Sequence, residues 1–111
     1  MMTAKNMKSP KSDSYYDYLI KSLQASEEAA AYIEAILEEE EPEPTLLKSA
    51  LLDVVEAFSN TTLSSEQAES QRNKLDDIFS QSGSQAIYGL ASWLSAMGLQ
   101  LSVNVQNQDD Q

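Results

Sequence analysis

The chain has 111 residues, 41% of them hydrophobic, which is enough for one domain with a modest core. It contains no cysteine and no histidine, which excludes disulfides, thiolate metal sites and the usual general base of enzymes. Beyond the first eleven residues, four basic side chains face eighteen acidic ones, a formal charge of −14. A charge of this sign repels nucleic-acid phosphates and attracts basic protein surfaces.

Both ends of the chain are polar. Residues 1–14 are predicted to be a disordered leader, and residues 106–111 a disordered tail. No apolar run approaches the ~20 residues that a bilayer requires, and the basic N-terminus is not followed by the apolar region of a signal peptide. The sequence therefore indicates a single domain at 15–105 in a cytoplasmic protein that has no membrane partner.

Apolar residues spaced three and four apart predict two helices in the first part of the chain. The first begins near Tyr15 and ends at Leu23. Ser26 is the expected N-cap of the second, which runs from about Glu27 to Glu39 and stops before Pro42. The apolar stripe of this second helix consists of Ala30, Ile33 and Leu37, with Ala29 and Ile36 beside it.

Residues 38–43 form a charged connector that contains Pro42. We interpret it as a solvated loop, because contiguous glutamates at a helix end do not offer the spaced oxygen ligands of a calcium site. A third helix is expected to begin at Pro44 or Thr45. It carries the strongest apolar stripe of the chain, formed by Leu47, Leu51, Val54 and Phe58 with Ala50 and Val55.

The region from Ser64 to Phe79 is polar and has two interpretations. Ser64 and Gln67 fit a capping box at its start. The region then either bends into two short helices or forms one continuous helix, since residues 61–81 contain neither glycine nor proline. After a turn around Gly83, a last amphipathic helix is predicted to end at Gly98. Its apolar residues are Ile87, Leu90, Ala91, Leu94 and Met97.

Strict alternation of apolar and polar residues predicts one short β-strand at the end of the domain. Its apolar members are Leu99, Leu101, Val103 and Val105. A lone strand leaves its backbone groups unpaired, so it needs a partner edge. That edge could be the same strand of a second copy, which gives a homodimer, or a strand of another protein; alternatively the segment packs as a tail on its own helices.

Several short motifs in this order resemble the small antidote proteins of prokaryotic addiction (toxin–antitoxin) modules. The resemblance spans residues 17–103. The motifs that carry it are DYL at 17–19, EAAAYI at 28–33, LEE at 37–39, AMGL at 96–99 and LSV at 101–103. The C-terminal half of such proteins is a helix-turn-helix domain of the lambda-repressor type.

The resemblance implies an all-α fold: a bundle of about five helices, lambda-repressor-like, with one short C-terminal β-strand. It implies an antitoxin-like transcriptional regulator that neutralises a small basic toxin and binds operator DNA, usually as a dimer. The recognition positions would be Gln71, Arg72, Asn73 and Lys74. Their residue types can read bases or phosphates.

The DNA-reading region departs from the family pattern. Glu69 stands where the family has the glycine that lets the chain bend, and Ser64, Ser65 and Ser70 replace apolar or small residues. From Glu66 to Asp77 two basic residues face four acidic ones, whereas specific DNA binders present a positive face. The alternative is therefore an acidic protein-binding module of the same fold that has lost DNA binding.

Other residues that attract attention have ordinary explanations. Trp93 could anchor a partner, but a half-buried core position is the simpler interpretation. Four tyrosines (15, 16, 18 and 32) could form an aromatic platform, although packing of two of them on the core is the simpler account. With no histidine, no cysteine and no Ser-x-x-Lys motif, the sequence predicts neither an enzyme nor a cofactor or metal site.

Overall fold

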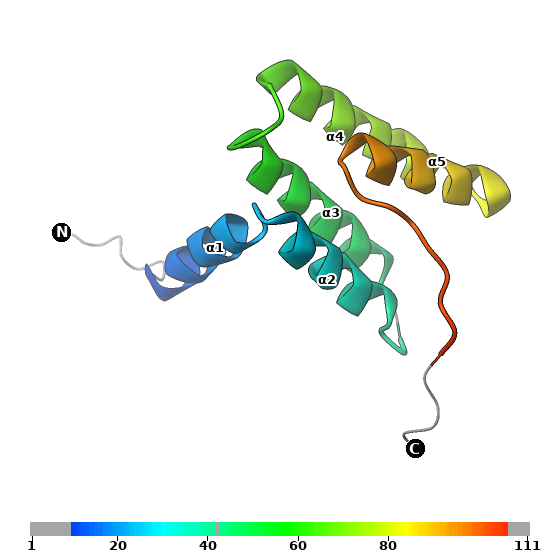
Figure 1. Ribbon diagram of the computed structural model, residues 1–111, viewed down its shortest axis with the longest axis horizontal. Coiled ribbons are helices and arrows are strands. Elements are labelled where there is room, and N and C mark those ends of the chain that lie inside the picture. Colours follow the sequence, from blue (N-terminus) through cyan, green and yellow to red (C-terminus); the bar gives the residue numbers. More distant parts are fainter. Residues whose placement is uncertain (1–9, 42, 107–111) are drawn as a thin grey trace.

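Five α-helices make up the part of the chain that the computed structural model describes, residues 10–41 and 43–106 (Figure 1). They are α1 (Pro10–Ser22), α2 (Ser26–Leu37), α3 (Pro44–Ser59), α4 (Ser65–Phe79) and α5 (Gly83–Ala96). No β-strand is assigned among these residues, so the predicted helical bundle is confirmed for this part of the chain. None of the described helices is long and apolar enough to cross a membrane.

Helix α3 is the centre of the bundle. It packs against α1, α2 and α4, and α5 packs against α4. In Figure 1, α1 and α2 lie on one side of α3, and the α4–α5 pair lies on the other. The helix with the strongest apolar stripe in the sequence therefore occupies the position with the most neighbours, as burial of apolar area requires.

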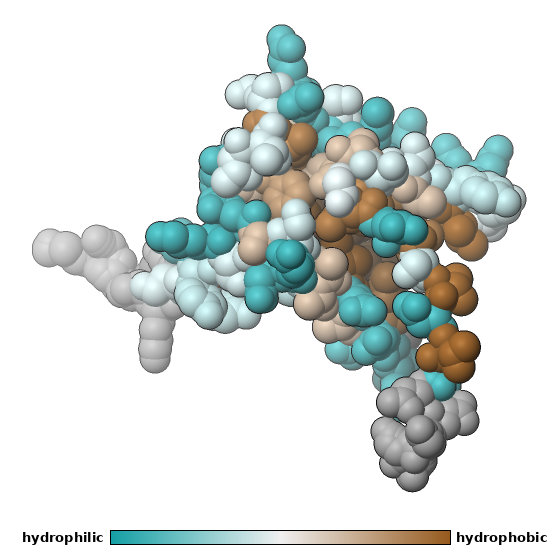
Figure 2. Space-filling model, in the orientation of Figure 1, coloured by the Kyte–Doolittle hydropathy of each residue, from teal (hydrophilic) through white to brown (hydrophobic). Residues whose placement is uncertain are grey.

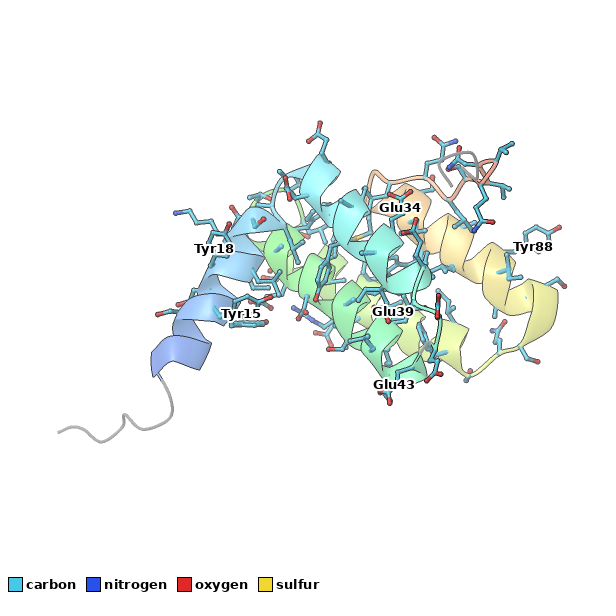
Figure 3. The ribbon with its side chains drawn as sticks, turned by 90° about the horizontal axis from the view of Figure 1, so that it is seen from below. Tyr15, Tyr18, Glu34, Glu39, Glu43 and Tyr88 are labelled. Carbon is cyan, nitrogen blue, oxygen red and sulfur yellow. The ribbon has the colours of Figure 1, made fainter. Side chains whose placement is uncertain are left out.

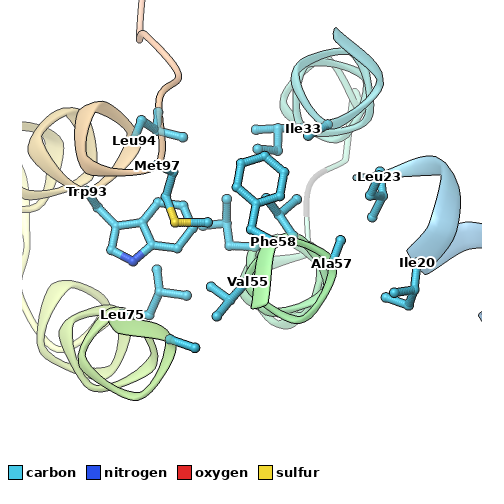
Figure 4. Packing of buried hydrophobic residues seen from close by; sticks show 14 residues of the cluster. Ile20, Leu23, Ile33, Val55, Ala57, Phe58, Leu75, Trp93, Leu94 and Met97 are labelled. Atoms are coloured by element: carbon cyan, nitrogen blue, oxygen red, sulfur yellow. The ribbon is translucent and has the colours of Figure 1, made fainter. Parts of the chain in front are cut away.

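The side chains of α3 also form the middle of the core. Leu51 and Val55 are completely buried, and the predicted stripe of this helix is confirmed. Figure 4 shows Phe58 between Trp93 of α5 and Ile33 of α2, so a single α3 side chain lies between the two halves of the bundle. One contiguous apolar cluster thus joins all five helices.

Two helix starts differ from the prediction. Helix α1 begins at Pro10, five residues before the predicted start of the domain, because proline is favoured at the first helical position. Ser26 is the first residue of α2 rather than its N-cap: Ala25 holds the cap position with extended backbone and makes no side-chain cap bond. The remainder of the predicted leader, residues 1–9, and residues 107–111 of the predicted tail lie outside the described residues.

The end of α5 directs the chain back onto the core. Gly98 follows the C-cap residue Met97 and has a φ of 82°, which glycine adopts without strain. The Gly98 amide donates to Ser95 O at 3.0 Å and the Leu99 amide to Leu94 O at 2.8 Å. These two bonds are those of a Schellman motif, in which the residue after the glycine contacts the last turn of the helix. Leu99 is accordingly packed against the core.

The segment that follows is not a strand in this structure. Residues 99–106 are extended without regular hydrogen bonding, and they run from the end of α5 alongside α2 (Figure 1). Of the four residues predicted to form the strand, Leu99 is partly buried and Leu101 is 36% exposed, whereas Val103 and Val105 are 96% and 95% exposed. Only the start of the segment therefore packs on the helices, and residues 10–41 and 43–106 offer the remainder no strand edge to pair with.

Replacing Leu51 by alanine is expected to lower the free energy of unfolding by about 2–5 kcal/mol, because the side chain is fully enclosed and a cavity would remain. Leu46 lies exposed on the same helix, so Leu46→Ala should cost less than about 1 kcal/mol. Urea unfolding followed by circular dichroism measures both values. Equal losses would contradict the central position of α3.

Candidate functional site

The predicted DNA-reading region forms one continuous helix. Helix α4 runs from Ser65 to Phe79, so of the two interpretations of this region the continuous helix is correct and the two short helices are wrong; Glu69 is an exposed residue inside the helix. The predicted capping box is confirmed, because the Ser64 amide donates to Gln67 Oε1 at 2.8 Å and the Gln67 amide donates to Ser64 Oγ at 3.1 Å. With a cap at its start and no glycine inside, nothing interrupts the helix.

Gln71, the first predicted reader of DNA, is a core residue. It is 5% exposed, and its side-chain amide donates to Trp93 O at 3.4 Å. In return the indole Nε1–H of Trp93 donates to Gln71 O at 3.0 Å. The pair joins α4 to α5 and satisfies polar groups that burial would otherwise leave unpaired. Trp93 is 2% exposed, so it is a core residue as expected, but it is fully buried and not half-buried.

The other three predicted readers diverge around α4, because consecutive helical residues point ~100° apart. Arg72 turns toward α3, where its Nη2 lies 3.4 Å from Glu56 Oε1. Asn73 and Lys74 are exposed on the outer side of the helix. The structure therefore does not bring the four predicted residues together on one surface.

The surface around Lys74 is acidic. Glu66, Glu69 and Asp77 lie beside it along the outer side of α4. A second basic residue, Lys48 of α3, is paired with Asp76 at 2.8 Å. Partly exposed ion pairs of this kind contribute little to stability, but they neutralise the charges that a DNA backbone would need.

A tyrosine–carboxylate cluster lies between the first three helices. Tyr32 of α2 donates a hydrogen bond from its hydroxyl to Asp53 Oδ2 of α3 at 3.2 Å. Burial, the Asp53 charge and this bond together raise the pKa of Tyr32 to about 12. Burial also raises the pKa of Asp53; the bond from Tyr32 acts in the opposite direction, and the Glu56 charge adds to the rise. Burial, followed by the charges of Asp53, Glu56 and Asp17, raises the pKa of Tyr16.

Of the four tyrosines singled out in the sequence, Tyr32 packs against the core, whereas the expected packing of a second one there is not found among the described residues. Tyr15 and Tyr18 of α1, which are labelled in Figure 3, are exposed, and so is Tyr16. Tyr32 is partly buried and bonded to Asp53. The Tyr32–Asp53 pair is a feature that the sequence analysis missed. The two residues are 21 positions apart, and no local spacing relates them.

Carboxylates gather on α2 and the loop that follows it. We call residues 27–43 the acidic segment; its glutamates are Glu27, Glu28, Glu34, Glu38, Glu39, Glu40, Glu41 and Glu43. All eight are exposed, and Figure 3 shows Glu34, Glu39 and Glu43 along the end of α2 and the connection to α3. Neither of the ion pairs found in the described part of the chain involves them. No group of His, Cys, Asp or Glu among the described residues could hold a metal ion.

A long stretch in the C-terminal part of the sequence is free of charge. Residues 78–106, which include α5 and the extended segment after it, contain no Asp, Glu, Lys or Arg. This stretch exposes apolar side chains, among them Ile87 and Tyr88 on α5 and Val103 and Val105 after it. Figure 2 shows brown, apolar patches at the end of α5 and along the extended segment.

An open groove of about 220 Å³ separates α2 from the extended segment. On the α2 side it is lined by Ala30, Ile33, Glu34 and Leu37. On the other side it is lined by Leu94, Leu99, Leu101 and the polar residues between and after them, Gln100, Ser102 and Asn104. Ala30 and Leu37, which belong to the predicted apolar stripe of α2, are exposed and border this groove instead of the core.

No protein-family model, curated protein or solved structure matches this chain. The resemblance to addiction-module antidotes thus depends on the sequence motifs alone.

Glycine at position 69 tests the continuity of α4. Glu69→Gly is expected to lower the free energy of unfolding by about 1 kcal/mol relative to Glu69→Ala, because glycine is unfavourable inside a helix. The alanine variant controls for loss of the side chain. If the chain turned at this position, glycine would be tolerated better than alanine, and urea unfolding would show the opposite order.

Alkaline titration tests the Tyr32–Asp53 pair. The pKa of Tyr32 lies above its ordinary value of 10.0, so the stability that it contributes is present below pH 10 and is lost as the pH rises toward about 12. The free energy of unfolding should therefore fall across this window, and it should fall less in Tyr32→Phe. Urea unfolding at several pH values measures the slope. Tyr18→Phe, which removes an exposed hydroxyl, is the control and should leave the slope unchanged.

Proposed function

We propose that this protein is an acidic helical docking module that binds a basic surface of a partner protein. The observation that carries the proposal is the uniformly negative charge of residues 22–47, which contain eight glutamates and no basic residue. The field of such a surface concentrates basic partners near it and accelerates their encounter.

The position of the acidic segment supports the proposal. Its glutamates are exposed on α2 and the following loop, and in the described part of the chain the basic residues Lys48 and Arg72 pair with Asp76 and Glu56 instead. These glutamates therefore remain available for a partner. Exposed carboxylates also keep a shell of water, so their contribution is to association rate and specificity more than to affinity.

Operator binding is left out of the proposal. Of the four residues expected to read DNA, Gln71 is buried and Arg72 is paired with Glu56. The remaining two, Asn73 and Lys74, lie on a helix side that also carries Glu66 and Glu69. A protein that binds DNA needs several phosphate contacts from basic residues, and this surface offers one lysine.

The resemblance to addiction-module antidotes points to the chemistry of the partner. Those antidotes neutralise small basic toxins, and the charge of this chain is complementary to such a protein. The function proposed here is thus the protein-binding half of an antidote, without gene regulation through α4.

Binding to a short basic protein encoded beside this gene tests the proposal. Association rates measured at low and at high salt should fall as salt screens the charges. Glu39→Gln with Glu40→Gln should slow association about threefold to tenfold, because these charges belong to the acidic segment. Glu66→Gln with Glu69→Gln changes the net charge by the same amount on α4 and should have less than about a twofold effect.

Two outcomes would contradict the proposal. One is equal slowing by both pairs of substitutions, which would show that only net charge matters. The other is saturable, sequence-specific binding of the full chain to duplex DNA from upstream of its own gene, measured by fluorescence anisotropy, if Arg72→Ala with Lys74→Ala abolishes it. That result would restore operator reading.

A further inference from the structure

The extended segment after α5 has backbone groups and side chains without partners. We call residues 99–105 the tail segment. Within the described part of the chain, residues 100–106 make no backbone–backbone hydrogen bond, and Val103 and Val105 are almost fully exposed. An extended segment of this composition is a ready edge for strand pairing.

Charge limits what can cover this segment. The tail segment and all of α5 are uncharged, while the rest of the chain is strongly acidic. Two copies of this protein repel each other wherever acidic surfaces meet, so the uncharged stretch that precedes Asp109 and Asp110 is where they can approach at least cost. A basic partner, in contrast, finds no carboxylate on the tail segment itself.

We infer that the tail segment binds the same segment of a second copy in an antiparallel two-stranded ladder, with Val103 opposite Val103. Because apolar and polar residues alternate along the segment, a two-fold axis at Val103 pairs residues of the same kind. Leu101 then faces Val105, and Ser102 faces Asn104, so apolar side chains share one face of the ladder and neutral polar side chains share the other.

The first residue of the tail segment is anchored on the core, and this anchoring determines the register of the ladder. Leu99 is held against its own core by the Schellman motif at Gly98, so it is not free to join the ladder. Pairing centred on Val103 uses residues 101–105, which are the exposed ones. It also places the two Leu99 residues about 27 Å apart along the ladder. The C-terminal ends of the two α5 helices therefore do not meet.

The groove beside the tail segment supplies the apolar support that a short ladder needs. A two-stranded ribbon alone is only marginally stable in water. Ala30 and Leu37 of α2 border the groove and remain exposed in the single chain. The partner's strand, lying along the tail segment, covers this part of the apolar stripe of α2 in each copy.

Oligomeric state measured with no partner protein present tests the inference independently of the proposed function. Because the interface is small, sedimentation of the full chain should be followed up to about 1 mM. Dimers are expected, and their fraction should rise with salt, because salt screens repulsion between like-charged copies. Binding of a basic partner should show the opposite salt dependence. A protein that stays monomeric at high concentration and high salt would overturn the inference.

Neutral substitutions locate the interface. Val103→Ser with Val105→Ser leaves the charge unchanged and should weaken dimerisation about tenfold or more. Ile87→Ser with Tyr88→Ser removes two other exposed apolar side chains from the same uncharged region and should have little effect. Equal weakening by both pairs would mean that the tail segment is not the interface.

An introduced disulfide tests the register directly, because the chain has no cysteine of its own that could form another cross-link. Residues directly opposite in an antiparallel pair have Cα atoms about 4.5–5.5 Å apart, within the range of a disulfide. Val103→Cys should therefore cross-link at least about tenfold faster under mild oxidation than Tyr88→Cys, whose side chain is also exposed. Cross-linking of Val103→Cys no faster than that of Tyr88→Cys would overturn the proposed pairing.

Discussion

Burial of α3 on three sides is the constraint on which the rest of this structure depends. Its side chains contact α1 and α2 on one side and α4 on the other, and Phe58 lies between Ile33 and Trp93 (Figure 4). Each fully buried aliphatic side chain contributes about 1.5–3 kcal/mol, which is a large fraction of the net stability of a chain this size. The positions of the other helices depend on the apolar surface that each of them buries against α3.

The packing of α4 and α5 follows from that constraint and determines which surfaces remain. Leu75 of α4 and Trp93 of α5 turn toward α3, and the reciprocal bonds between Gln71 and Trp93 hold the two helices in register. Gly98 then returns the chain to the core at Leu99. As a result the acidic segment belongs to α2 and the loop after it, and the uncharged residues belong to α5 and the tail segment; the two surfaces border each other at the groove beside Glu34.

Much of the fold could be predicted from sequence because its signals are local. The apolar stripe of α3, the capping box of α4 and the glycine at the end of α5 all depend on residues within a few positions of each other. The candidate site was less predictable. The four residues matched to a recognition helix were chosen by resemblance, whereas the structure places Gln71 in the core and Arg72 beside Glu56. The sequence shows that residues 78–106 carry no charge. Which of their apolar side chains are buried and which are exposed depends on the tertiary structure.

The sequence alone determined the helical class, most helix ends, the strong negative charge and the alternation of the tail segment, because each follows from composition or from neighbouring residues. Only the tertiary structure decided that Gln71 is paired with Trp93, that Tyr32 bonds to Asp53, and that Val103 and Val105 stay exposed. These outcomes depend on which faces of distant segments meet. That is set by the burial of the whole core and by no local pattern.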